Sequence, residues 1–142
     1  SAINDAIEHA VGLPRAGEYW PIRSLIESGA LLAAGSDWPS VVPSMDPWVG
    51  IEAMITRQDP QGKRKGSLWQ EQAITLEQAL KIYTLNGAAA LRLEQQTGSI
   101  ELGKSADLIV LNHHLFKIAA QQISETKVLY TFFAGNNVYQ QK

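Results

Sequence analysis

The nine residues from Leu31 to Pro39, LLAAGSDWP, constrain the fold of this chain more than any other stretch. An unbroken run of small and apolar residues, Ala30 to Ala34, ends at Gly35. Such a short run between turn residues predicts a strand that is buried on both faces of a parallel sheet. In α/β sheets and barrels the reactive groups lie just past the carboxyl ends of the strands. Asp37 follows this strand directly, so it is the first candidate for a functional residue.

The composition is that of one ordinary globular core and excludes several classes of protein. The chain has 142 residues, of which 45% are hydrophobic, and a net charge of −2, so no strong field attracts it to nucleic acid or to an anionic membrane. There is no cysteine, which excludes disulfides and thiolate metal sites, and only three histidines are available as metal ligands. No apolar run approaches the roughly 20 residues that a membrane helix needs. Residues 1–18 lack the pattern of a secretory signal, so a cytoplasmic location is predicted.

Helices are predicted mainly in the first two thirds of the chain. The clearest begins at Thr75, where Thr75 and Gln78 form the sequence pattern of a capping box. Asp46-Pro47 predicts another helix start, an N-cap followed by proline. Asn86-Gly87 is expected to interrupt the Thr75 helix. Further helices are predicted within 1–18, over 21–28 and over 88–93.

The character of the sequence changes near residue 96. Ala106–Leu111 and Lys127–Phe133 are predicted strands, and the turn residues Gly135-Asn136-Asn137 lead into a third extended piece at Val138-Tyr139. A short extended segment is also expected at residues 100–102. The pattern therefore predicts an α/β chain in two parts: residues 1–96, mostly helical with one buried strand, and residues 97–142, built from strands.

Asp37 allows two interpretations when it is considered by its position alone. It can cap a turn before Trp38-Pro39, which is the commoner role of an aspartate in such a place, or it can be catalytic. A free aspartate, with a pKa of about 3.9, is a poor base at neutral pH unless a metal ion activates the attacking water. One carboxylate cannot hold such an ion, because catalytic zinc usually has three protein ligands. Trp38 and Trp48 flank this loop, and they serve either as core packing, which we favour, or as walls of a substrate pocket.

The remaining polar clusters favour structural roles. His113 and His114 are adjacent, so a strand would point them to opposite faces, and we interpret them as a polar strand end. His9 lies alone on a predicted helix. Lys63-Arg64-Lys65 lies between glycines and is interpreted as a solvated loop rather than a nucleic-acid site.

Four motifs, in this order, resemble the metal-dependent amidohydrolase superfamily, and most closely its long-chain branch of N-substituted formamide deformylase-like hydrolases. The last, G-x-I-x-x-G-x-x-A-D-L-I-V-L, is highly specific, and the resemblance extends from about Trp20 to Tyr139. The motifs are Gly35-Ser36-Asp37-Trp38-Pro39, Ile74–Leu80, Tyr83–Ala88 and Gly98–Leu111.

The resemblance implies a (β/α)8 barrel with a small β-sandwich and the hydrolysis of a C–N bond in a small amide or cyclic amide. It implies that Ala30–Ala34 is the last barrel strand. It also implies that Asp37 contacts a divalent metal, zinc in the first instance, and carries a proton from the metal-bound water to the leaving amine. The histidines that hold the metal in this superfamily have no counterpart in these 142 residues.

The size of the chain leads to the same expectation, because a (β/α)8 barrel takes about 250 residues. We therefore expect a C-terminal piece of a longer hydrolase, inactive and without bound metal when alone. Its uncovered strand edges are expected to cause self-association. The alternative is a non-catalytic binding or assembly module, in which Asp37 only serves its turn.

Overall fold

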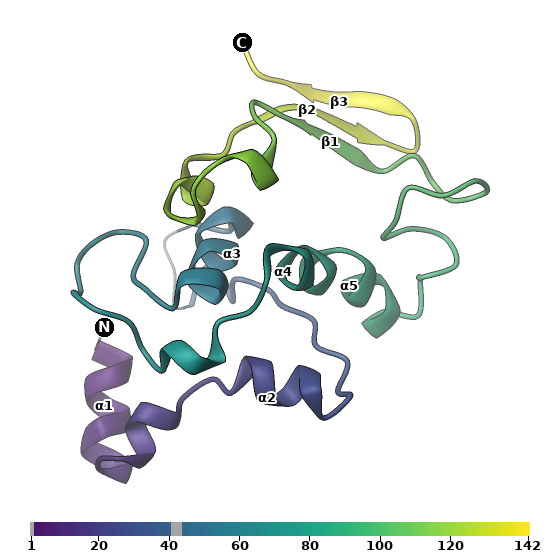
Figure 1. The fold of residues 1–142 in the computed structure, drawn as a ribbon. Helices are drawn as coiled ribbons and strands as arrows, with labels where there is room; N and C mark the ends of the chain where they lie inside the picture. The colour runs from purple at the N-terminus through teal and green to yellow at the C-terminus, as the bar shows by residue number, and fades with distance from the viewer. Residues whose placement is uncertain (1, 41–43) are drawn as a thin grey trace.

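The computed structural model describes residues 2–40 and 44–142 as a set of short helices with a small antiparallel sheet at one end (Figure 1). Residues 41–43, between Pro39 and the helix start predicted at Asp46-Pro47, lie outside the described residues. The α-helices are α1 (Ala2–Val11), α2 (Ile22–Glu27), α3 (Pro47–Thr56), α4 (Leu76–Tyr83) and α5 (Leu85–Ala90). The 3-10 helices are η1 (Arg15–Glu18), η2 (Gln70–Gln72), η3 (Leu115–Lys117) and η4 (Ala120–Glu125). The strands are β1 (Leu108–Leu111), β2 (Val128–Phe133) and β3 (Asn136–Gln140).

The helix starts that were predicted from capping residues are confirmed. The Asp46 carboxylate accepts a hydrogen bond from the Trp48 N–H at 3.0 Å, with Pro47 in the first helical position. At α4 the Thr75 hydroxyl accepts from the Gln78 N–H at 3.2 Å, and the Gln78 side chain accepts from the Thr75 N–H at 2.9 Å. These side chains satisfy backbone donors that a helix start leaves without partners.

The predicted interruption at Asn86-Gly87 is wrong in position. Both residues lie inside α5, and the break falls at Thr84, whose backbone leaves the helical region at φ −122° and ψ −91°. Asn86 is held in the helix because its side-chain amide donates to the Leu32 carbonyl at 2.9 Å. A tertiary contact therefore outweighs the weak helix preference of these two residues.

The segment Ala30–Ala34 is not a strand buried on both faces, and this prediction is wrong. The segment forms neither helix nor strand, and it pairs with no strand among the described residues. Its residues alternate: Leu32 and Ala34 pack against the core, whereas Leu31 is 61% exposed and Ala33 is also exposed. A strand is buried on both faces only where helices cover both sides of its sheet, and the described residues cover only the side of Leu32 and Ala34.

The sheet has the order β1-β2-β3, with both pairs antiparallel. β2 and β3 form a hairpin through Ala134 and Gly135, which have φ values of 48° and 80°. Two consecutive positive φ values are typical of the tight turns that match the twist of a hairpin. The predicted strands are thus confirmed, although Asn136 and Asn137 belong to β3 and residues 100–102 form an exposed loop rather than a strand.

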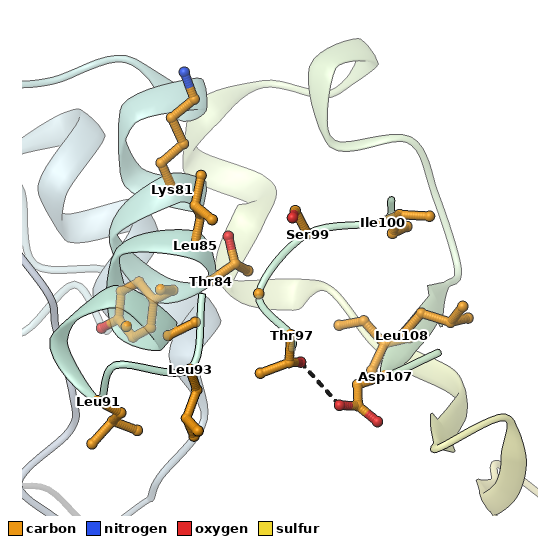
Figure 2. A pocket seen from close by; sticks show the side chains of 15 residues that line it. Lys81, Thr84, Leu85, Leu91, Leu93, Thr97, Ser99, Ile100, Asp107 and Leu108 are labelled. Carbon is orange, nitrogen blue, oxygen red and sulfur yellow. Dashed lines mark hydrogen bonds between the residues drawn. The ribbon is translucent and has the colours of Figure 1, made fainter. Parts of the chain in front are cut away.

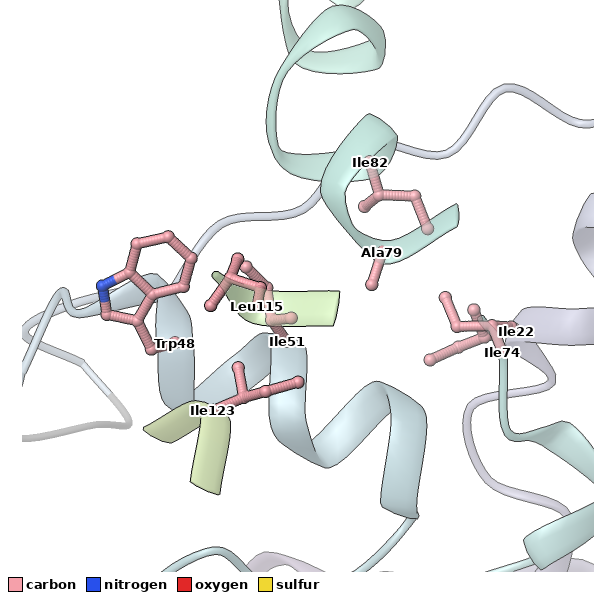
Figure 3. Close-up of a cluster of buried hydrophobic side chains, with 8 residues drawn as sticks. All are labelled: Ile22, Trp48, Ile51, Ile74, Ala79, Ile82, Leu115 and Ile123. Carbon is pink, nitrogen blue, oxygen red and sulfur yellow. The ribbon is translucent and has the colours of Figure 1, made fainter. Parts of the chain in front are cut away.

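The hydrophobic core joins residues from both parts of the sequence (Figure 3). Ile51 on α3 and Ile123 on η4 are each 1% exposed, and η4 packs directly on α3. The buried Glu52 strengthens this contact, because its carboxylate accepts from the Ser124 N–H at 2.7 Å. The core residues are Ile22, Trp48, Ile51, Ile74, Ala79, Ile82, Leu115 and Ile123. The division at residue 96 remains a prediction.

The basic segment Lys63-Arg64-Lys65 lies on the surface of the molecule. Arg64 forms an ion pair with Asp5 at 2.7 Å, with both side chains largely in solvent, as the solvated-loop interpretation expects. Within the described residues, no helix has the length and apolar character required to cross a membrane.

Candidate functional site

Asp37 is the first residue of a tight turn that follows residues 30–36. Its backbone is in the left-handed region, at φ 55°, and its carbonyl accepts from the Ser40 N–H at 2.9 Å. The Ser36 hydroxyl accepts from the Trp38 N–H at 3.2 Å. Aspartate is among the few non-glycine residues that adopt this conformation readily. The local geometry thus accounts for an aspartate here by the turn alone, and it leaves the carboxylate exposed to solvent.

The turn is fixed to the helices through the backbone that precedes it. The hydrogen bond from the Asn86 amide to the Leu32 carbonyl joins α5 to this segment, five residues before Asp37. Sequence reasoning missed this role, because Asn86-Gly87 resembles a turn. The segment expected to end in a reactive group is therefore positioned by a side chain rather than by a neighbouring strand.

The two tryptophans beside the turn lie in different environments. Trp48 is 5% exposed and belongs to the core, which is the packing role that we favoured (Figure 3). Trp38 is 49% exposed and is not part of the core, so the packing role that we favoured is wrong for this residue. Neither indole lines the large groove described below. A shared substrate pocket between Trp38 and Trp48 remains a prediction.

The described residues do not assemble a metal centre. No group of three or more histidine, aspartate or glutamate side chains lies close enough, anywhere in residues 2–40 and 44–142, to hold an ion. His113 is engaged with the Thr126 hydroxyl at 3.0 Å, and His114 accepts from the Phe116 N–H at 3.3 Å. His9 is exposed on α1. The residues present therefore do not fit a catalytic zinc ion, which needs several protein ligands at once.

A groove of about 760 Å³ lies between the α4–α5 pair and the start of β1 (Figure 2). Its walls are mainly apolar, with Leu85 on α5, Ile100 in the following loop and Leu108 on β1. The sequence predicted the individual helices and strands, but it did not predict that they form a groove, because the walls come from positions far apart in the chain. The lining is formed by Lys81, Tyr83, Thr84, Leu85, Gly87, Ala88, Leu91, Leu93, Thr97, Gly98, Ser99, Ile100, Asp107, Leu108 and Ile109.

The carboxylate in this groove is committed to structure. Asp107 accepts from the Ala134 N–H at 2.8 Å and from the Ser105 hydroxyl at 2.8 Å. It also accepts from the Thr97 hydroxyl at 2.9 Å, and Figure 2 shows this third bond. These three donors, the Ala134 amide first, hold the pKa of Asp107 below its usual value. Burial raises the pKa of the neighbouring Tyr83. A carboxylate with all these partners fixes the β2–β3 turn to the loop at Thr97 and is a poor acid or base.

The solved structures include a relative with this arrangement. An amidohydrolase from Thermotoga maritima superposes with a TM-score of 0.62 at 29% sequence identity, covering 84% of this chain and 26% of the other. The helices and the small antiparallel sheet thus define an α/β structure of the amidohydrolase class. The chain belongs to the Amidohydrolase family, whose model matches residues 2–139.

Individual relatives agree with this assignment. The chain is 31% identical over 120 residues to an N-substituted formamide deformylase of Arthrobacter pascens, covering 83% of this chain and 21% of the relative. It is 31% identical over 122 residues to an imidazolonepropionase of Porphyromonas gingivalis, covering 86% of this chain and 26% of the relative. The chain thus spans between a fifth and a quarter of the length of these curated relatives.

Proposed function

We propose that this chain contributes to a hydrolase that cleaves C–N bonds in a small amide or cyclic amide. The observation that carries the proposal is the family match over residues 2–139 together with the names of the relatives, which include a formamide deformylase, an imidazolonepropionase and a 5'-deoxyadenosine deaminase. Hydrolysis of each of the corresponding substrates breaks a bond from carbon to nitrogen.

Asp37 is the residue to which we assign the proton transfer. Asp37 is exposed at the turn that follows residues 30–36, so its carboxylate can reach a substrate held outside this turn. In the proposed role it removes a proton from the attacking water and later gives the proton to the leaving nitrogen. Both transfers involve the same carboxyl group, which therefore has to reach the water and the leaving group in turn.

The remaining machinery would come from polypeptide outside these 142 residues. A divalent ion, zinc by resemblance, would supply activation of the water, but its other ligands are absent from the described residues. We propose that residues 1–96 correspond to the last units of a (β/α)8 barrel and residues 97–142 to strands of a composite β-sandwich. The chain alone is then inactive, and its open strand edges make it self-associate.

The second candidate is a non-catalytic binding or assembly module. The favouring observation is the separation of the main groove from Asp37: the groove lies between α4–α5 and β1, and Asp37 is not part of its lining. In such a module the aspartate would only serve its turn, as its left-handed backbone allows.

The decisive experiment compares the 142-residue chain with the polypeptide obtained when the coding sequence is extended upstream in frame. Amine or ammonia release from a panel of formamides and cyclic amides is measured, with metal content by mass spectrometry. The extended protein should be active, and Asp37→Asn should lower its kcat by about 10²-fold or more, the usual contribution of an acid–base group. Asp46→Asn is the matched control, because asparagine caps a helix as well as aspartate does.

Several outcomes would contradict the proposal. Stoichiometric zinc and turnover in the 142-residue chain would contradict its dependence on other polypeptide. Full activity of the extended Asp37→Asn protein would remove the role of Asp37. An upstream stop codon immediately before Ser1 would favour the module.

A further inference from the structure

The backbone that leads to Asp37 is held by a side chain from a distant helix. The Asn86 side-chain amide, on α5, donates to the Leu32 carbonyl at 2.9 Å, and this hydrogen bond is half-buried. Asn86 and Leu32 are 54 positions apart in the chain, whereas Asp37 follows Leu32 by only five residues. The bond therefore joins α5 to the segment that ends at the candidate aspartate.

Residues 30–36 need such a contact, because regular structure does not hold them. They form neither helix nor strand, and they pair with no strand in the part of the chain that the structure describes. The apolar contacts of Leu32 and Ala34 with the core are not directional, so they do not fix the position of the segment along its own axis. A hydrogen bond does fix that position, since it is strong only over a narrow range of distances and angles.

Asn86 can act as an anchor because α5 is itself held in place. Ala88, two residues further along α5, is 7% exposed, and Gly98 packs so closely on it that a Cβ at Gly98 would lie 2.6 Å from the Ala88 Cβ. At the start of α5 the Thr84 hydroxyl donates to the Leu80 carbonyl of α4 at 2.8 Å. A group that positions another group has to be supported in this way.

We propose that Asn86 is a positioning residue for Asp37 in the proposed hydrolysis. This inference rests on the proposed function and adds to it a residue that touches neither the substrate nor the metal. The amide acts at the Leu32 carbonyl, and the five residues that follow carry the position of that carbonyl to the turn. A displacement of about 1 Å in a reacting group can cost about 10²-fold in rate, so turnover depends on this contact.

The test is a double-mutant cycle in the upstream-extended protein, with kcat as the readout. Asn86→Asp replaces the amide by a carboxylate of nearly the same size, which cannot donate and repels the Leu32 carbonyl oxygen. It should lower kcat by about tenfold or more, up to the loss that Asp37→Asn causes. In the Asp37→Asn background the same change should lower kcat by less than about twofold, because the effects of residues that act as a unit are not additive.

This cycle separates positioning from stability. A loss of folded protein reduces kcat by the same factor in both backgrounds, whereas a positioning effect disappears once the Asp37 carboxylate is removed. Asn112→Asp is the matched control, because Asn112 accepts the Lys127 N–H at 2.9 Å and a carboxylate accepts that bond equally well. It should leave kcat unchanged in both backgrounds. If circular dichroism shows that Asn86→Asp is unfolded, the cycle is run with Asn86→Ala, which adds no charge.

The outcomes distinguish a failure of this inference from a failure of the proposed function. Suppose that the extended protein is active and that Asp37→Asn slows it. An unchanged kcat in the Asn86 variants, equal losses in both backgrounds, or unfolding of both Asn86 variants would then overturn the positioning role alone. An inactive extended protein, or one that Asp37→Asn does not slow, would overturn the proposed function and this inference with it.

Discussion

Gly98 provides the most direct test of how the loop after α5 packs. A Cβ added at this position would lie 2.6 Å from the Ala88 Cβ and 3.2 Å from the Leu85 Cα, both on α5. The backbone of Gly98 also has φ +92°, which side-chain-bearing residues rarely adopt. Gly98→Ala therefore introduces a steric clash against a helix and a backbone strain together.

Gly103 separates these two effects. Its φ is +89°, but a Cβ built there meets nothing within 4 Å. Gly103→Ala should lower the free energy of unfolding by about 1–2 kcal/mol, the cost of a left-handed residue. Gly98→Ala should lower it by about 2–5 kcal/mol, because overpacking adds about 1–3 kcal/mol. The entropy that alanine removes from the unfolded chain affects both variants alike.

Urea denaturation, followed by tryptophan fluorescence and far-UV circular dichroism, measures the difference. The two variants should share the m-value of the parent chain and differ in midpoint, with Gly98→Ala clearly lower. Equal midpoints would refute the close packing of residue 98 against α5, and with it the described shape of the groove wall. A Gly103→Ala variant that is the less stable of the two would refute it more strongly.

Two further predictions concern hydrogen bonds that fix the site and the sheet. Because the folded-state pKa of Asp107 is lowered by the Ala134 amide and two hydroxyls, its contribution to stability is present above the unfolded pKa of about 3.9 and is lost as the pH falls through the folded value. Urea midpoints measured from pH 7 downward should therefore fall less steeply in acid for Asp107→Asn than for the parent, and parallel curves would contradict this. Asn86→Ala removes the donor to the Leu32 carbonyl and should cost about 1 kcal/mol. Hydrogen exchange should then accelerate over residues 30–37, whereas unchanged exchange there would show that the amide does not position the turn.

Local features of the sequence were predictable because their causes are local. The caps at Asp46 and Thr75 involve residues two or three positions apart, and each hydrogen bond forms as the pattern predicts. β1 and β2 likewise follow from short apolar runs, and β3 follows from the turn at Gly135. In such cases the pattern that predicts an element lies within a short stretch of the chain, so the sequence alone contains the information.

Features that depend on distant neighbours were not predictable in the same way. The run Ala30–Ala34 resembles a strand that is buried on both faces. Its burial depends on the residues that pack against it, and the described residues cover only one face. The role of Asn86 was missed for the same reason, since its acceptor, the Leu32 carbonyl, is 54 positions away. The groove beside β1 is another such feature, because α4–α5 and β1 create it only by meeting.

The role of Asp37 likewise depends on groups that are distant in the sequence. Asp37 was predicted to follow a buried strand, but residues 30–36 form no strand among the described residues. Its proton-transfer role remains a prediction that depends on side chains outside the described residues. The left-handed turn is a sufficient reason for an aspartate at position 37, whether or not the residue is catalytic. The assignment therefore depends on the family, and the Asp37→Asn comparison is needed to establish it.

The shared core has a consequence for how related chains could be recombined. Trp48 and Ile51 precede residue 96, whereas Leu115 and Ile123 follow it, and all four are buried in one cluster. A chimera joined at residue 96 would unite halves whose buried side chains came from different parents. Homologous sequences should therefore exchange this region successfully only when α3 is inherited together with η3 and η4.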